Sequence, residues 1–200
     1  MQNIFKKTLL AATTATLLAG AAHGGGHEEK VGVILGFTGP IESLTPTMAG
    51  SAELAFAEAS SSGLLLDGKV IVAVRVDSTC VDSSAATAAA ERLVNSDNVV
   101  AIMGADCSGV TGAIAKNVGA PNGVAMISPS ATSPGLTSIE DNGVFFRTAP
   151  SDARQGVVLA DIVMARGIDT VAVTYTNNDY GKGLADAFAT AYRAAGGTIT

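Results

Sequence analysis

Aromatic and histidine side chains are scarce in this 200-residue sequence. It has no Trp, Phe and Tyr make up 4% of the residues, and the only two histidines are His23 and His27 near the N-terminus. A Ser/His/Asp hydrolase needs a histidine within its folded part, and a structural zinc site needs four suitable ligands. We therefore expect neither a hydrolase nor a metal site, and no motif indicates a cofactor.

Basic residues are also few: 12 Lys and Arg stand against 18 Asp and Glu, for a formal net charge of -6. Two of the basic residues, Lys6 and Lys7, lie in a segment that we expect to be removed, which leaves a net charge of about -8. Such a chain is a poor partner for nucleic acid or an anionic membrane surface. Apolar residues are abundant at 48%, so the chain can bury a sizeable core and does not have the composition of a disordered protein.

Residues 1–22 have the pattern of a signal peptide. A short basic region is followed by a weakly apolar run over residues 8–19, and Ala19-Gly20-Ala21 fits a cleavage site. The alternative is a membrane anchor, but the run is too short and too rich in Thr and Ala to span about 30 Å of hydrocarbon. No Cys lies nearby for lipid attachment. The sequence thus predicts export to the periplasm, with no membrane insertion after cleavage.

The two cysteines, Cys80 and Cys107, lie within the region that we expect to fold. In an exported protein an even number of cysteines favours a disulfide. A metal-binding pair and a nucleophilic cysteine are the alternatives, and the lack of further ligands weakens the first of them. A bridge closing a loop of this length would contribute roughly 3–4 kcal/mol to stability.

Hydrophobic periodicity predicts an alternation of strands and helices. A continuous apolar run such as residues 99–103 is typical of a strand that is buried on both faces. Alternating elements of this kind form βαβ units and a parallel sheet flanked by helices, which is an α/β fold. The predicted strands cover residues 30–37, 69–76, 99–103, 124–127, 144–147, 170–174 and 198–200, and the predicted helices cover residues 47–61, 83–95, 108–118, 152–166 and 180–195.

Thr148-Ala149-Pro150 marks the best boundary between two parts of the chain. We expect a first α/β lobe over residues 28–150 and the beginning of a second α/β lobe over residues 151–200. The second part has about fifty residues, which is fewer than a self-sufficient domain usually has. We therefore expect the sequence to be a fragment of a longer protein.

Candidate ligand groups follow the carboxyl ends of the predicted strands, where open α/β sheets bind their ligands. These segments carry hydroxyls and free amides but no Lys or Arg, and none is a phosphate-binding glycine loop. Ser108, at a predicted helix start, could hold a carboxylate with its hydroxyl and the first amides. Thr132 could share that carboxylate or accept from an ammonium, and the backbone carbonyl of Ser130 could accept from the ammonium as well. The alternative is that they are ordinary caps and turn residues, as Asp77 is expected to be.

Six motifs in a fixed order, behind the predicted signal peptide, give the chain a family resemblance from about residue 30 onward. It resembles the type I periplasmic binding proteins of the leucine/isoleucine/valine-binding group, which serve ATP-driven (ABC) importers. The motifs are Val33-Ile34-Leu35-Gly36-Phe37-Thr38-Gly39-Pro40, Asp77-Ser78-Thr79-Cys80, Gly104-Ala105-Asp106-Cys107-Ser108, Ile127-Ser128-Pro129-Ser130-Ala131-Thr132-Ser133-Pro134, Phe146-Arg147-Thr148-Ala149-Pro150-Ser151-Asp152 and Asn178-Asp179-Tyr180-Gly181-Lys182-Gly183.

The resemblance implies a non-enzymatic protein whose two lobes close around a small amino acid, with an inner-membrane ABC permease as partner. It implies a disulfide between Cys80 and Cys107. It also implies that Tyr180 closes over the ligand from the second lobe, and that an acidic partner of the ammonium lies beyond residue 200. The residues that it assigns to the carboxylate and ammonium of the ligand are Ser108, Ser130, Ala131 and Thr132.

Two departures from the family pattern affect the expected ligand. Leu44 stands where the family often has an aromatic residue, and Ser61-Ser62-Gly63 lacks the usual pair of glycines. A branched-chain amino acid is the leading expectation, while relatives of the same build bind amides, urea or aromatic acids. A sensory ligand-binding domain of the same fold and, more remotely, an exported hydrolase are the other hypotheses.

Overall fold

A computed structural model describes residues 28–65 and 68–200 of the chain. The predicted signal peptide over residues 1–22 lies outside the described residues. We call residues 28–65 and 68–147 the N-terminal body and residues 152–200 the C-terminal segment.

A five-stranded parallel sheet forms the centre of the N-terminal body. Its strands occur in the order β2-β1-β3-β4-β5, and every neighbouring pair is parallel. The predicted α/β fold class is therefore confirmed. The strands are β1 (Glu28–Leu35), β2 (Val70–Asp77), β3 (Ala101–Gly104), β4 (Ala125–Ser128) and β5 (Phe145–Arg147).

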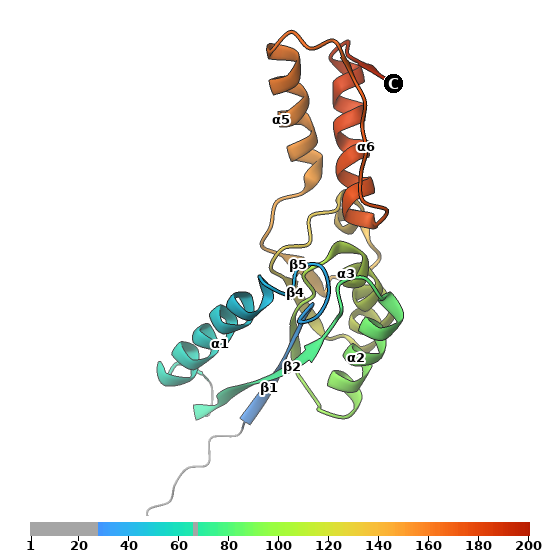
Figure 1. The fold of residues 1–200 in the computed structure, drawn as a ribbon. Coiled ribbons are helices and arrows are strands. Elements are labelled where there is room, and N and C mark those ends of the chain that lie inside the picture. The colour runs from blue at the N-terminus through green and yellow to red at the C-terminus, as the bar shows by residue number, and fades with distance from the viewer. Residues whose placement is uncertain (1–27, 66–67) are drawn as a thin grey trace, which may run out of the picture.

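Helices cover both faces of this sheet, as Figure 1 shows. Helix α1 (Thr45–Ser61) packs on one face, and α2 (Ser83–Asn95) and α3 (Ser108–Ile114) pack on the other. Alternation along β1 explains the two cores: Val33 and Leu35 face α1, whereas Ile34 joins the larger core under α2 and α3. Both faces are buried, so β1 is apolar without interruption from residue 33 to residue 35.

Helix α3 continues without a break into a π-helical turn, η2 (Ala115–Gly119), and a last turn, α4 (Ala120–Asn122). Gly123 then ends the helical run in a left-handed conformation with φ of 64°. The chain passes through a 3-10 turn, η3 (Pro134–Ser138), between β4 and β5.

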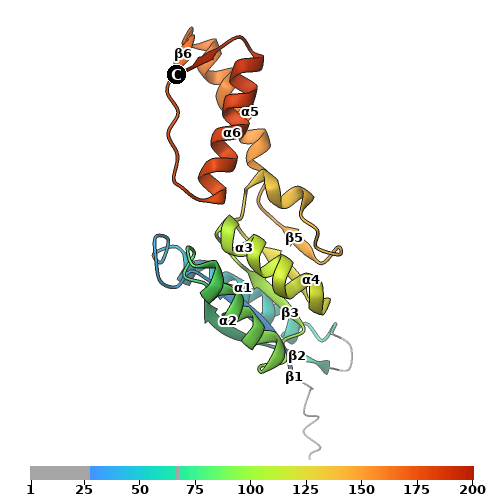
Figure 2. The ribbon, with the colours of Figure 1, turned by 90° about the vertical axis from the view of Figure 1, so that its right-hand side faces the viewer.

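The C-terminal segment stands apart from the five-stranded sheet (Figures 1 and 2). Helices α5 (Asp152–Ala165) and α6 (Asp179–Ala194) pack along each other, and Gly156 allows this because a Cβ there would lie 2.6 Å from the backbone of Ala187. A second parallel sheet pairs β6 (Thr170–Val171) with β7 (Thr198–Ile199).

Most predicted elements are confirmed, with boundaries displaced by one or two residues. Two predictions are wrong in extent. The strand predicted over residues 170–174 ends at Val171, because β7 pairs only with Thr170 and Val171. The helix predicted over residues 108–118 changes from α to π geometry after Ile114. Of the helices in the described ranges, none combines the length and apolar character needed to cross a bilayer.

Candidate functional site

The carboxyl ends of the parallel strands meet the C-terminal segment at a cavity of about 710 Å³. Its lining comes from the loops after β1, β2, β3 and β4, from the starts of α3 and α5, and from the start of α6 across the opening. The lining residues are Pro40, Ile41, Leu44, Met48, Cys80, Val81, Ser83, Asp106, Cys107, Ser108, Gly109, Val110, Ser130, Thr132, Asp152, Gln155, Thr176, Asn177, Asn178, Asp179 and Tyr180.

Ser108 is the first residue of α3, as the sequence predicts, and is only 3% exposed. The first bond of the helix runs from Thr111 N–H to the carbonyl of Cys107. Within the described residues, the preceding amides of Ser108, Gly109 and Val110 have no acceptor, as expected at a helix start. Ser108 Oγ accepts a hydrogen bond from Ser133 N–H at 3.1 Å, so its own proton remains available to an anion.

Thr132 makes a contact that decides which ligand group its hydroxyl can serve. Its hydroxyl donates to Asp152 Oδ2 at 2.8 Å, and Asp152 N–H donates back to the carbonyl of Thr132 at 2.9 Å. The hydroxyl proton is thereby used, so Thr132 Oγ1 can only accept a further bond. An ammonium suits this position and a carboxylate does not.

Asp152 is the site residue to which the sequence analysis gave no role. Its side chain is 1% exposed, yet it lines the cavity beside Thr132. No ion pair of the described residues includes it. The Asp at the end of the Phe146–Asp152 motif, directly after a helix cap, was the only available signal, and it is equally typical of an ordinary first-turn acid.

The other predicted site residues fall into two groups. Ser130 and Tyr180 line the cavity, and Tyr180 is 45% exposed at the start of α6. Ser130 Oγ donates to the carbonyl of Asp106 at 3.0 Å. Ala131 is buried and does not line the cavity; its N–H donates to Ser128 Oγ and its carbonyl accepts from Arg147. A ligand role for Ala131 stays a prediction that the cavity does not support.

The charged side chains of described residues that line the cavity are all acidic. Its lining includes Asp106, Asp152 and Asp179 but no Lys, Arg or His from the described part of the chain. A purely anionic ligand would meet repulsion here without a compensating cation. A ligand that carries a cationic group beside its anionic group fits the lining better.

One wall of the cavity is aliphatic. Ile41, Leu44, Met48 and Val81, from the loops after β1 and β2 and the start of α1, supply it, and Leu44 and Val81 are exposed. No aromatic residue of the N-terminal body lines this wall. An apolar side chain of a ligand would be desolvated against these four residues.

A larger cavity of about 990 Å³ adjoins the first on the other side of Gly109 and Asp179. It runs between α3 and α6, and its lining is mainly small and apolar side chains, with Lys116 and Lys182 among the polar ones. Of the strand-end groups described above it includes only Ser108. The smaller cavity, which has both the free amides and the Thr132–Asp152 pair, is therefore the candidate site.

Asp77 is the last residue of β2, and its side chain caps the neighbouring loops, as expected of a turn or cap group. It accepts hydrogen bonds from the hydroxyl of Thr38 at 2.5 Å and from the amides of Thr38 and Thr79. Burial raises the pKa of Asp77 and is the largest single influence, but the hydrogen bonds from Thr38 and Thr79 together outweigh it and hold the pKa below its usual 3.8.

This lowered pKa predicts an acid-dependent contribution of Asp77 to stability. A carboxylate with a depressed folded-state pKa stabilises the protein above its unfolded pKa of 3.8, and the contribution is lost as pH falls through the folded pKa. Thr38→Val should therefore lower the urea midpoint at pH 6, and the gap to wild type should narrow as the pH falls below about 4. Thr87→Val, which touches no titratable group, is the control. A gap that stays constant with pH would contradict the prediction.

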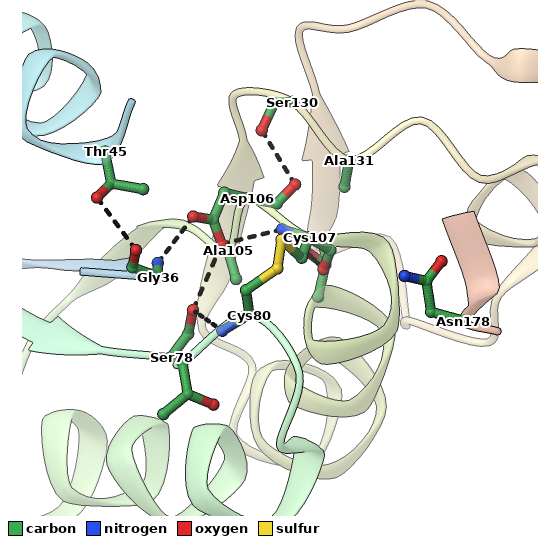
Figure 3. The surroundings of a disulfide bond; sticks show 12 residues. Gly36, Thr45, Ser78, Cys80, Ala105, Asp106, Cys107, Ser130, Ala131 and Asn178 are labelled. Carbon is green, nitrogen blue, oxygen red and sulfur yellow. Dashed lines mark hydrogen bonds between the residues drawn. A yellow bond between two sulfur atoms is a disulfide. The ribbon is translucent and has the colours of Figure 1, made fainter. Parts of the chain in front are cut away.

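Cys80 and Cys107 form a disulfide in the structure, with the two sulfur atoms 2.03 Å apart. The bridge ties the loop after β2 to the residue that precedes α3 (Figure 3). It therefore connects the segment that carries Val81 to the segment that carries Ser108. No group of three or more metal-ligating side chains occurs in the ranges 28–65 and 68–200.

Comparison with known proteins places this arrangement in a family. Residues 28–200 match the family described as periplasmic binding protein. The chain belongs to this family. The match covers the whole described structure, including the C-terminal segment, so both sides of the cavity are parts of a periplasmic binding protein.

Similar proteins point to one branch of the family. The Leu/Ile/Val-binding protein BraC3 of Rhizobium johnstonii is 34% identical over 192 residues, which cover 95% of this chain and 50% of the relative. The leucine binding protein LivK of Thermotoga maritima has a TM-score of 0.75 and 26% identity over 86% of this chain and 47% of its own. The branched-chain amino acid transporter substrate binding protein LivJ of Streptococcus pneumoniae, solved with isoleucine, has a TM-score of 0.74 and 30% identity over 86% and 48%.

This chain of the periplasmic binding protein family spans about half the length of the curated relatives that it matches. The fold of the chain is thus established by the comparisons, while the ligand and partners of the whole protein are matters for a proposal.

Proposed function

We propose that the chain is part of the periplasmic substrate-binding component of an ABC importer, and that it binds a zwitterionic amino acid with an aliphatic side chain. The observation that carries the proposal is the cavity in which free helix amides and a Thr132–Asp152 pair converge, with no basic side chain among the described residues that line it. Relatives whose names include Leu/Ile/Val binding support the same ligand class.

The proposed ligand lies with its carboxylate at the start of α3. The amides of Ser108 and Gly109 donate to it. The hydroxyl of Ser108 also donates to it, because Ser108 Oγ accepts a hydrogen bond from Ser133 N–H and its own proton is free. Charge-assisted hydrogen bonds of this kind are short and about twice as strong as neutral ones. The helix dipole adds favourable potential for an anion at that end.

The ammonium lies at the Thr132–Asp152 pair. Thr132 Oγ1 accepts one ammonium proton, and the buried carboxylate of Asp152 supplies the opposite charge. Ser108 and Thr132 are close neighbours, because the Ser133 amide that follows Thr132 reaches Ser108 Oγ. A small zwitterion such as an α-amino acid, whose charged groups are attached to one carbon atom, suits two ends that lie close together.

The aliphatic wall receives the side chain of the ligand. Ile41, Leu44, Met48 and Val81 offer apolar surface without hydrogen-bonding groups in the side chains. Burying a branched aliphatic side chain there contributes about 1.5–3 kcal/mol. Benzoate-like acids lack the ammonium that Asp152 requires, and urea lacks the carboxylate that the helix start requires, so neither satisfies both ends.

In this proposal the N-terminal body is the first lobe, up to residue 150, and the C-terminal segment begins the second lobe, from which Tyr180 covers the ligand. Binding rather than catalysis is the role, the export signal directs the protein to the periplasm, and an inner-membrane permease receives the loaded form. Closure of two lobes on a ligand is a hinge motion of the kind common in binding proteins.

A thermal-shift series on the full-length protein tests the ligand class. L-leucine, L-isoleucine and L-valine should raise the melting temperature, because a ligand at 100 times its Kd adds about 2.7 kcal/mol of stability. N-acetyl-L-leucine, L-leucinamide and benzoate are matched controls that lack the ammonium, the carboxylate and the ammonium, respectively, and should give no shift. A shift with benzoate, or none with any amino acid, would overturn the proposal.

A further inference from the structure

Asp106 is a buried acid in the centre of the strand ends. It is 3% exposed and directly precedes Cys107, and no ion pair of residues 28–65 or 68–200 includes it. A buried carboxylate without a basic partner is costly unless donors surround it. The use of such a residue two positions before the proposed anion site therefore requires an explanation.

Three donors from three different elements converge on this carboxylate (Figure 3). Gly36 N–H, after β1, donates to Oδ2 at 2.7 Å. Cys107 N–H, before α3, donates to Oδ1 at 2.9 Å, and the Ser78 hydroxyl, after β2, lies 3.4 Å from the same oxygen. The side chain thus joins the ends of β1 and β2 to the residue from which α3 begins.

The close approach depends on a glycine. A Cβ added at Gly36 would lie 3.3 Å from Asp106 Oδ2 and 3.0 Å from the Cβ of Cys80. The carboxylate and the disulfide therefore fill the space that a side chain at position 36 would need. The absence of a Cβ at position 36 thus lets Asp106 approach the strand end without displacing its neighbours.

The backbone around Asp106 also holds the second half of the candidate site. The carbonyl of Asp106 accepts from Ser130 Oγ at 3.0 Å, and the carbonyl of Ala105 accepts from Ser128 Oγ at 2.5 Å. Ser128 Oγ in turn accepts from Ala131 N–H at 3.0 Å. Hydrogen bonds to the carbonyls of residues 105 and 106 thus hold the turn that leads to Thr132.

We propose that Asp106 is a positioning residue of the ligand site: its carboxylate fixes the start of α3, and with it Ser108, relative to the strand ends and to the turn that carries Thr132. The proposal rests on the function proposed above. Protein donors occupy the carboxylate, so Asp106 acts through Cys107 and Ser108 rather than by binding the amino acid.

The geometry requires a carboxylate rather than an amide. Asp106 accepts on both oxygens, whereas asparagine has one acceptor oxygen and one NH₂ donor. In Asp106→Asn the NH₂ group would face the N–H of either Gly36 or Cys107. A variant of the same size should therefore weaken one of these two hydrogen bonds, and loss of the Gly36 bond would release the end of β1 from the start of α3.

The experiment compares Asp106→Asn with Leu93→Ala in the full-length protein. Leu93 is a buried residue of α2 that packs into the core and does not line the cavity, so its truncation destabilises the same body without touching the strand ends. Calorimetric titration with L-leucine gives Kd. Hydrogen exchange without ligand gives the protection of the Gly36 and Cys107 amides and of the start of α3.

We expect Asp106→Asn to raise Kd for L-leucine about tenfold and to accelerate exchange at Gly36 and Cys107 beyond any change in global stability. Leu93→Ala should keep the wild-type Kd. Gly36→Ala, which pushes on the same carboxylate, should repeat the Asp106→Asn result and is the second variant should Asp106→Asn not fold. Unchanged Kd and unchanged local exchange in both strand-end variants would overturn the positioning role.

The outcomes for the two proposals are separable. Failure of the wild-type protein to bind L-leucine or any other amino acid would refute the proposed function. The exchange rates at Gly36 and Cys107 would still decide the positioning role, because they are measured without ligand. Faster local exchange supports the role, and unchanged exchange overturns it.

Discussion

Asp152→Asn should weaken amino-acid binding about 100-fold, the largest loss that we expect from a single isosteric change in the cavity. The carboxylate of Asp152 is buried and accepts from Thr132, so its charge is poorly screened by solvent. A hydrogen bond to a charged group contributes about 1.5–3 kcal/mol, and asparagine would also direct an NH₂ donor at the ammonium. A loss near 2.7 kcal/mol corresponds to about a factor of 100 in Kd.

The matched control is Asp179→Asn. Asp179 lines the same cavity and carries the same charge, but it is exposed at the start of α6 and has no bond to Thr132. If the net charge of the cavity were all that mattered, both variants would lose affinity equally. Titration with L-leucine should instead show a loss of only a few fold for Asp179→Asn.

Thr132→Val gives an independent check on the Asp152 prediction. If Thr132 and Asp152 bind one ammonium together, the double variant should lose much less binding free energy than the sum of the losses in the two single variants. The reason is that each residue depends on the other. Additive losses in the double-mutant cycle would contradict a shared role, and an unchanged Kd in Asp152→Asn would refute the assignment of the ammonium.

The fold was predictable from local patterns. The continuous apolar run over residues 99–103 and the alternation of strands and helices indicate a parallel α/β sheet without knowledge of long-range contacts. Ser108 could be placed at a helix start for the same reason, since the motif that ends at Ser108 passes from an apolar strand to a helical spacing. Elements whose extent depends on a partner were less predictable: β6 stops where its pairing with β7 stops.

The sequence alone could not show which end of the site suits a carboxylate and which suits an ammonium. Thr132 was equally suited to a carboxylate or an ammonium until the direction of its bond to Asp152 was known, and those residues are 20 positions apart. Asp152 itself has the position of a first-turn acid, for which a helix dipole is a sufficient reason. Asp106 likewise acquires its role only when β1 and β2 bring Gly36 and Ser78 to it.

Loss of the Cys80–Cys107 disulfide should have the largest effect on stability among the changes considered. The two cysteines are 27 residues apart, and closing a loop of this size removes unfolded-state entropy worth about 3.5 kcal/mol at 25 °C. The total free energy of unfolding of a typical domain is only about 5–15 kcal/mol. Reduction should therefore lower the denaturant midpoint strongly, while the slope of the unfolding curve changes only through the denatured state.

The replacement Cys80→Ala/Cys107→Ala is the control for this measurement, because reductant can act on the wild-type bridge but has no target in the double variant. Wild type under reducing conditions and the double variant under either condition should unfold at similar midpoints, all well below oxidised wild type. The disulfide and Asp106 hold the same junction, since Cys107 is both the bridged residue and a donor to that carboxylate. Reduction should consequently cost more binding affinity in Asp106→Asn than in wild type, and equal costs would show that the two restraints act independently.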